Sequence, residues 1–97
     1  MTNKGIARKV ITACTEVFGV TRKDILGRSR KAEIVTARHS AIWLCYKYLD
    51  MTCSQIGTEF NRDRTLVIYA IKMVENRIAC DGLFGLNLFA VELKLFK

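Results

Sequence analysis

Apolar residues recur at helical spacing along most of the chain, and this pattern predicts helices rather than strands. One stripe covers residues 3–18, and a longer one covers residues 33–49. Residues three and four positions apart lie on the same face of an α-helix, so each stripe marks a helix with one buried face. The first stripe comprises Ile6, Val10, Cys14, Val17 and Phe18; the second comprises Ile34, Ala37, Ala41, Leu44, Cys45 and Tyr48, widened by Ile42 and Trp43. We expect the second helix to form the centre of the core.

Residues 52–78 predict two more helices joined by a tight turn. Thr52 and Gln55 have the spacing of a capping box, in which the hydroxyl accepts a backbone N–H and the amide reaches back, so a helix begins directly after Thr52. Asn61 favours a turn because asparagine tolerates left-handed backbone angles, and Asp63 is placed to cap the next helix. The buried faces comprise Ile56 and Phe60 in the first helix, and Val67, Ala70, Ile71, Val74 and Ile78 in the second.

The second helix of this pair carries polar side chains at its N-terminal end, where Arg64 and Thr65 lie off the apolar stripe. A short helix, a tight turn and a longer helix of this kind are typical of a helix-turn-helix, whose second helix enters the major groove of DNA. A plain helical hairpin has the same pattern, so the periodicity alone leaves both interpretations open.

The remaining segments predict two further helices. Thr21 and Asp24 suit the start of a short helix that ends near Leu26. Residues 81–82, Asp-Gly, mark a turn, and a last helix follows over residues 86–96. Its apolar residues fall on more than one side: Leu86, Phe89, Ala90 and Leu93 are expected to pack back, which leaves Leu88, Val91, Leu95 and Phe96 as extra core or as a partner surface. We therefore expect an all-α single domain of about six helices over residues 1–97.

The net charge of the chain indicates what kind of partner it binds. The chain has 97 residues and a net charge of +7, and 51% of its residues are hydrophobic, which is typical of a folded domain. Residues 1–50 hold 10 basic and 4 acidic residues, net +6, whereas residues 51–97 hold 6 and 5, net +1. The excess favours an anionic partner, and nucleic acid is preferred over an anionic membrane surface or an acidic protein because the basic residues adjoin the predicted helix pair.

The densest basic segment is the stretch Gly-Arg-Ser-Arg-Lys-Ala-Glu at residues 27–33, which we term the basic loop. It contains Arg28, Arg30 and Lys31, and Arg38 follows in the next helix. Most charge clusters are simply solvated loops. This one has too few acidic residues to neutralise itself, so an anionic partner is the stronger interpretation.

The cysteine and histidine residues predict neither a metal site nor an enzyme. Cys14, Cys45, Cys53 and Cys80 form no close pair of the kind that zinc sites use. The single histidine, His39, has no nucleophile or paired carboxylate at a convincing spacing, and a surface or half-buried position is expected for it. We predict no cofactor. Free cysteines and the lack of an apolar N-terminal signal segment favour a soluble, cytoplasmic protein.

The helix pair and the segment before it resemble a known family. The stretch Ile-Gly-Thr-Glu-Phe-Asn-Arg-Asp-Arg-Thr-Leu-Val-Ile-Tyr-Ala at residues 56–70 is similar to the C-terminal DNA-binding domain of DnaA, the bacterial replication initiator. The matching positions are Ile56, Gly57, Phe60, Arg62, Asp63, Thr65, Val67 and Ala70. The preceding residues 17–44 also resemble the family, with an aromatic-glycine turn, a short helix, a basic loop and an arginine-rich entry to a long helix.

The resemblance implies double-stranded DNA binding by a helix-turn-helix at residues 52–80. By position it implies base contacts in the major groove from Arg62, Asp63, Arg64 and Thr65, and minor-groove or phosphate contacts from Arg28, Arg30, Lys31 and Arg38. Arg30 corresponds to the arginine that reaches into the minor groove. The apolar C-terminal helix at residues 83–97 is a possible homodimer or protein-partner surface. A helical interaction module that binds an acidic partner is the alternative function.

Three departures from the family alter what is expected. Two glycines usually separate the family's Phe and Arg, whereas this chain has only Asn61; Arg64 replaces a His, and Leu66 replaces a Thr. The chain also lacks a G-x-x-x-x-G-K-[ST] segment, so we expect a free-standing domain without the ATPase module. Such a domain, in a cell or in a phage or mobile element, would act at the nucleoid by regulating replication or transcription.

Overall fold

Six α-helices and no strand make up residues 3–96, the part of the chain that this computed structural model describes. They are α1 (Asn3–Phe18), α2 (Arg22–Leu26), α3 (Ala32–Tyr48), α4 (Cys53–Phe60), α5 (Arg64–Cys80) and α6 (Gly82–Leu95). The predicted all-α class is confirmed.

Side-chain caps determine where several helices begin. The Thr52 hydroxyl accepts the Gln55 N–H at 3.1 Å, and the Gln55 side-chain carbonyl accepts the Thr52 N–H at 2.9 Å, which is the predicted capping box. Thr21 and Asp24 form the same reciprocal pair at 3.0 and 3.1 Å. Local sequence therefore fixes the starts of α2 and α4.

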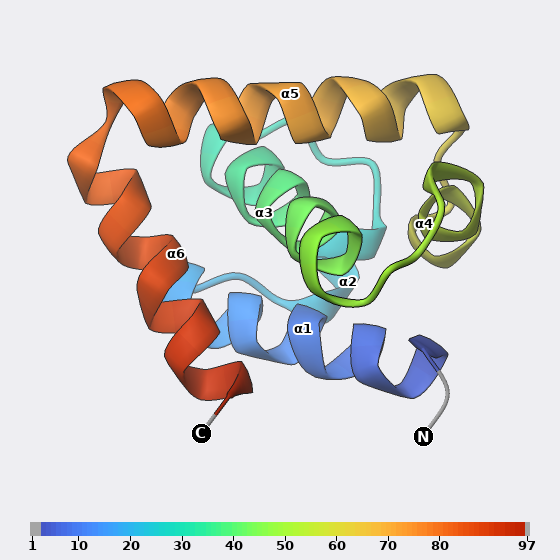
Figure 1. Ribbon diagram of the computed structural model, residues 1–97, viewed down its shortest axis with the longest axis horizontal. Coiled ribbons are helices and arrows are strands. Elements are labelled where there is room, and N and C mark those ends of the chain that lie inside the picture. Colours follow the sequence, from blue (N-terminus) through green and yellow to red (C-terminus); the bar gives the residue numbers. More distant parts are fainter. Residues whose placement is uncertain (1–2, 97) are drawn as a thin grey trace.

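The core is built around α3. This helix runs between α5 on one side and α1 on the other, while α6 and α4 close the two flanks (Figure 1). Most of its predicted stripe is buried, including Ala37, Ala41 and Leu44 at 0% exposure. Tyr48 is the exception to the prediction: it is 37% exposed at the end of α3, and its hydroxyl donates to Glu92 Oε2 at 2.9 Å. Burial of the tyrosine ring would have required a partner for that hydroxyl inside the core.

The stripe predicted along α5 is also shorter than expected. Val67, Ala70, Ile71 and Val74 are buried, but Ile78 is 38% exposed. The buried stripe therefore ends at Val74, and the last turn of α5 contacts α3 through the polar side chain of Arg77, which donates to Thr36.

The predicted start and orientation of the last helix are wrong. The helix begins at Gly82 rather than near residue 86, because the Asp81 carboxylate accepts the Phe84 N–H at 3.2 Å and caps an earlier turn. The buried residues of α6 are Phe84, Leu88 and Val91, whereas Leu86, Phe89 and Leu93, expected to pack inward, are each more than half exposed. With apolar residues on both sides of the helix, periodicity could not select the inner face.

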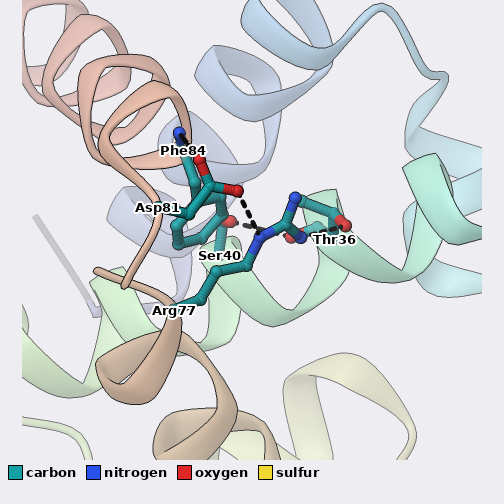
Figure 2. A network of polar contacts seen from close by, with 5 residues as sticks. All are labelled: Thr36, Ser40, Arg77, Asp81 and Phe84. Atoms are coloured by element: carbon teal, nitrogen blue, oxygen red, sulfur yellow. Dashed lines mark hydrogen bonds and ion pairs between the residues drawn. The ribbon is translucent and has the colours of Figure 1, made fainter. Parts of the chain in front are cut away.

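A polar network fixes the angle between α5 and α6 (Figure 2). Arg77 on α5 forms an ion pair with Asp81 at 3.4 Å and donates to the Thr36 hydroxyl on α3 at 2.9 Å. Its guanidinium also lies 4.6 Å from the centre of the Phe84 ring. Hydrogen bonding to the Phe84 N–H, with a smaller effect from Arg77, lowers the pKa of Asp81 below its usual value. The carboxylate therefore stays charged while it caps α6.

The cysteines divide between core and surface. Cys14 and Cys45 are fully buried, and burial raises the pKa of both thiols to about 12, so they remain protonated at neutral pH. Cys53 is half-buried and Cys80 is exposed. No helix in residues 3–96 is long and apolar enough to cross a membrane.

Candidate nucleic-acid interface

The turn between α4 and α5 depends on a close approach of two backbone segments. Asn61 adopts the predicted left-handed conformation, with φ 54° and ψ 47°, and the Arg62 N–H donates to the Gly57 carbonyl at 2.8 Å. A Cβ atom at Gly57 would lie 2.5 Å from the Arg62 carbonyl oxygen. Only glycine at position 57 lets the chain reverse this tightly.

Asp63 then starts α5. Its Oδ1 atom accepts the backbone N–H groups of Thr65 at 2.7 Å and Leu66 at 3.2 Å, as the capping prediction required. Arg64 and Thr65 are exposed on the first turn. Arg64 and Asp63, together with residues of α4, line a shallow hollow at the N-terminal end of α5.

Arg62 connects this turn to the basic loop. Its Nη1 atom donates to the carbonyls of Phe60 at 3.2 Å and Asn61 at 3.0 Å, and its Nη2 atom donates to the Gly27 carbonyl, 35 residues earlier in the chain. In this structure the guanidinium therefore faces the basic loop and is half-buried, rather than extending from α5.

Arg38 binds the same part of the chain through hydrogen bonds to backbone carbonyls. The side chain is only 6% exposed, and its guanidinium donates to three carbonyls: Nε to Ile25 at 2.7 Å, Nη2 to Asp24 at 2.9 Å and Nη1 to Ser29 at 3.1 Å. Burial lowers the pKa of Arg38, and the positive charge of Arg62 lowers it further. Arg38 thus fixes the path of the chain from α2 into the basic loop.

The remaining basic residues of the loop are exposed. Arg28, Arg30 and Lys31 form no ion pair within residues 3–96. Lys31 also occupies the position before α3, where its backbone N–H is 3.3 Å from the Ser29 hydroxyl. Their cationic groups remain available to a partner.

These parts enclose a cleft of about 330 Å³ between the basic loop, α3 and α5. Its lining residues are Arg28, Ser29, Arg30, Val35, Arg38, His39, Ile42, Arg62, Leu66 and Tyr69. Four arginines and no acidic residue contribute to the wall, so the cleft, which we term the arginine cleft, favours an anion. The predicted half-buried position of His39 is confirmed, and burial, followed by the Arg38 charge, lowers the pKa of its imidazole.

The amino-acid sequence that forms these elements matches a known protein family. A family description, Bacterial dnaA protein helix-turn-helix, matches residues 7–74, more than two thirds of the chain. The chain belongs to the DnaA helix-turn-helix family.

Curated relatives of the DnaA family agree with this assignment. A chromosomal replication initiator protein DnaA of Mycoplasma capricolum is 39% identical over 75 residues, which are 76% of this chain and 17% of that protein. DnaA 1 of Chlamydia pneumoniae is 36% identical over 70 residues, 72% of this chain and 15% of its own length. DnaA 2 of Protochlamydia amoebophila is 32% identical over 74 residues, which are 76% of this chain and 16% of that protein. The chain spans about one sixth of the length of these relatives.

Two exposed residues of the DnaA-type α5 helix were not predicted as site residues: Leu66 was noted only as a departure from the family, and Tyr69 was not singled out. Leu66 is 49% exposed and Tyr69 is 54% exposed, and both line the arginine cleft. The Tyr69 ring packs edge-on against His39, with ring centroids 6.0 Å apart. Their positions off the buried stripe of α5 indicated that both side chains are exposed. That they line a cleft could not be predicted, because the cleft forms only where α3 and the basic loop lie beside α5.

Proposed function

We propose that this protein binds double-stranded DNA, with α5 in the major groove and the basic loop over the adjacent minor groove and backbone. The observation that carries the proposal is the cleft in which arginines of the basic loop and residues of α5 face one another. An arrangement of this kind lets one protein surface contact two grooves. Family membership supports the same conclusion, because the relatives are named as chromosomal replication initiators.

The roles of the side chains divide by position. Arg64 and Thr65 are exposed at the start of α5 and would contact base edges. Asp63 caps the helix through Oδ1, and its Oδ2 atom would accept a hydrogen bond from a cytosine amine. Arg30 would enter the minor groove, and Arg28 and Lys31 would contact phosphates. Arg38 and Arg62 would act chiefly by holding the loop and the turn in place, since their guanidinium groups already bond to carbonyls.

The biological role that follows is occupation of specific sites on the bacterial or phage chromosome. A protein that occupies DnaA-type sites would regulate replication or transcription there. It would accordingly be found with the nucleoid.

Salt dependence provides the first test. Arg30→Ala or Lys31→Ala should weaken binding to all duplexes and reduce the slope of log affinity against log salt by about 0.9 for each phosphate that is no longer neutralised. Thr65→Val should instead reduce the preference for the best-bound duplex, identified by selection from random sequences, over a random duplex. Lys9→Ala, an exposed basic residue on α1, serves as the matched control and should change neither quantity. If wild-type binding has no salt slope, the protein is not a duplex binder, and a helical module for an acidic protein partner becomes the better interpretation.

Arg64 motivates a prediction about base preference. A guanidinium presents a planar fork that matches the O6 and N7 acceptors of guanine, which an imidazole does not. We expect a preference for a G·C pair opposite Arg64, and Arg64→Ala should lose about 1–3 kcal/mol of discrimination at that one position. The measurement is the affinity of wild type, Arg64→Ala and Arg64→His for duplexes varied at each base pair. A uniform loss across positions would assign Arg64 to a phosphate instead.

A further inference from the structure

The C-terminal helix α6 has a second apolar face that points away from the core. Phe84, Leu88 and Val91 fill the inner face at 0–3% exposure. The outer residues are Leu83 at 71% exposure, Leu86 at 65%, Phe89 at 55%, Leu93 at 56% and Phe96 at 62%. At roughly 100° per residue, these five positions fall within an arc of about 140° opposite the inner face. We term them the α6 outer face.

The charged residues of α6 lie at the edges of this face and are already paired. Glu92 accepts the Tyr48 hydroxyl at 2.9 Å, and Lys94 forms an ion pair with Glu16 at 2.9 Å. The Phe96 ring packs edge-on against Tyr48, with centroids 4.9 Å apart, and so extends the apolar surface to the end of α3. The outer face itself carries no charge.

The area of the α6 outer face suits a protein interface. Five large side chains, each more than half exposed, present roughly 600 Å² of apolar surface. This is at the upper end of the largest patch that a monomeric protein usually exposes, about 300–600 Å². Two such faces in contact would bury about 1,200 Å², the lower bound for a stable protein interface.

Charge favours a second copy of this chain as the occupant. The protein carries +7 overall, which opposes association through most of its surface, but residues 82–95 contain only Glu92 and Lys94 and are neutral. An acidic partner would find no cation to pair with on the outer face. Contact through α6 brings the least charged parts of two copies together and leaves both basic loops outside the interface.

The position of α6 is compatible with DNA binding by both copies. The helix follows the C-terminal end of α5, whereas α4 lies at the N-terminal end of α5 (Figure 1). The α5 residues that line the arginine cleft, Leu66 and Tyr69, belong to the N-terminal half of α5. The 17 residues of α5 span roughly 25 Å, so the two surfaces do not overlap. The family match ends at residue 74, and α6 is therefore outside the segment that defines this chain as DnaA-like.

We propose that two copies of this protein form a symmetric dimer through the α6 outer face. Around the two-fold axis the two helices pack antiparallel or nearly so, and Leu86 and Phe89 lie near the centre of the contact. The proposal is independent of the DNA-binding function, because no residue of the arginine cleft takes part. A dimer would present two DNA-binding surfaces on one assembly.

Sedimentation equilibrium over a roughly hundredfold range of protein concentration tests the dimer. Wild-type protein should fit a monomer–dimer equilibrium, and Leu86→Glu or Leu93→Lys should raise the dissociation constant roughly hundredfold, because each charge enters the symmetric contact twice. Tyr46→Glu is the matched control: Tyr46 is 47% exposed on α3, outside the α6 outer face, so this variant should dimerise as wild type does.

Circular dichroism identifies any variant that has failed to fold. Both α6 variants should keep the wild-type helix content and Tm at low concentration, since the replaced side chains are exposed. A wild-type protein that remains monomeric at the highest concentration overturns the proposal. A dimer that persists unchanged in both folded variants also overturns it, because the contact would then lie elsewhere.

Discussion

Replacing Arg38 with lysine should destabilise the protein nearly as much as replacing it with alanine. Arg38 bonds to three carbonyls of residues 24–29 through a planar fork that an ammonium group cannot reproduce. Hydrogen bonds to a charged group contribute about 1.5–3 kcal/mol each, less where they are part-buried, so Arg38→Ala should lose roughly 2–4 kcal/mol of unfolding free energy. Urea unfolding of wild type, Arg38→Lys and Arg38→Ala measures the difference.

The same substitutions should weaken duplex binding beyond the loss of stability. Without Arg38 the chain from α2 into the basic loop loses three hydrogen bonds, so the exposed cations of the loop would have to become more ordered when they bind. We expect affinity at temperatures where all variants are folded to fall at least about tenfold. Arg28→Ala is the control, because Arg28 is exposed and should lose affinity with unchanged stability. If Arg38→Lys retains the full stability of the wild type, the positive charge at position 38 stabilises the protein and the planar guanidinium group is not required.

Two glycine-to-alanine substitutions in helices should change stability in opposite directions. Alanine is more favourable than glycine inside a helix by about 0.5–1 kcal/mol. A Cβ at Gly85 meets no atom within 4 Å, so Gly85→Ala should raise the stability of the protein. A Cβ at Gly57 meets backbone atoms of the turn, with the Arg62 carbonyl oxygen at 2.5 Å. Gly57→Ala should therefore destabilise by about 1–3 kcal/mol despite its better helix propensity.

Gly57→Ala should also reduce DNA binding because the turn determines how α5 leaves α4. The clash moves Arg62 and the cap at Asp63, and with them the exposed residues of the first turn of α5. Thermal unfolding and duplex titration of both variants separate the effects. Equal Tm values for Gly57→Ala and wild type would mean that the turn adjusts freely and that glycine is not required at position 57.

The features that could be predicted from the sequence are those that depend on neighbouring residues. Thr52, Asp63 and Asn61 act on backbone groups within four positions, and the structure has each in its expected role. The central position of α3 also follows from its wide apolar stripe. Local patterns therefore predicted the two helices and the turn between them, whereas the resemblance to a known family was needed to choose a helix-turn-helix over a plain helical hairpin.

The features that could not be predicted depend on contacts between distant segments. The carbonyls of the α2 end and the basic loop that Arg38 and Arg62 bind lie 9 to 35 residues away, so nothing near either arginine indicates that its side chain faces the protein rather than an outside anion. For α6 the difficulty is different. Apolar residues occur on two opposite sides of this helix, and only its packing against α1 and α5 selects the inner one.

If the proposed DNA contacts are correct, the bond between Arg62 and Gly27 has a consequence for the spacing of a recognised DNA site. It joins the turn before α5 to the basic loop and so restrains movement between the two parts that we propose contact the two grooves. One extra base pair moves a DNA site about 3.4 Å along the helix axis and turns it by roughly a tenth of a revolution. A DNA site with a single base pair inserted between its major-groove and minor-groove segments would therefore contact either α5 or the basic loop, but not both. The protein would then recognise only sites with one spacing between these two segments.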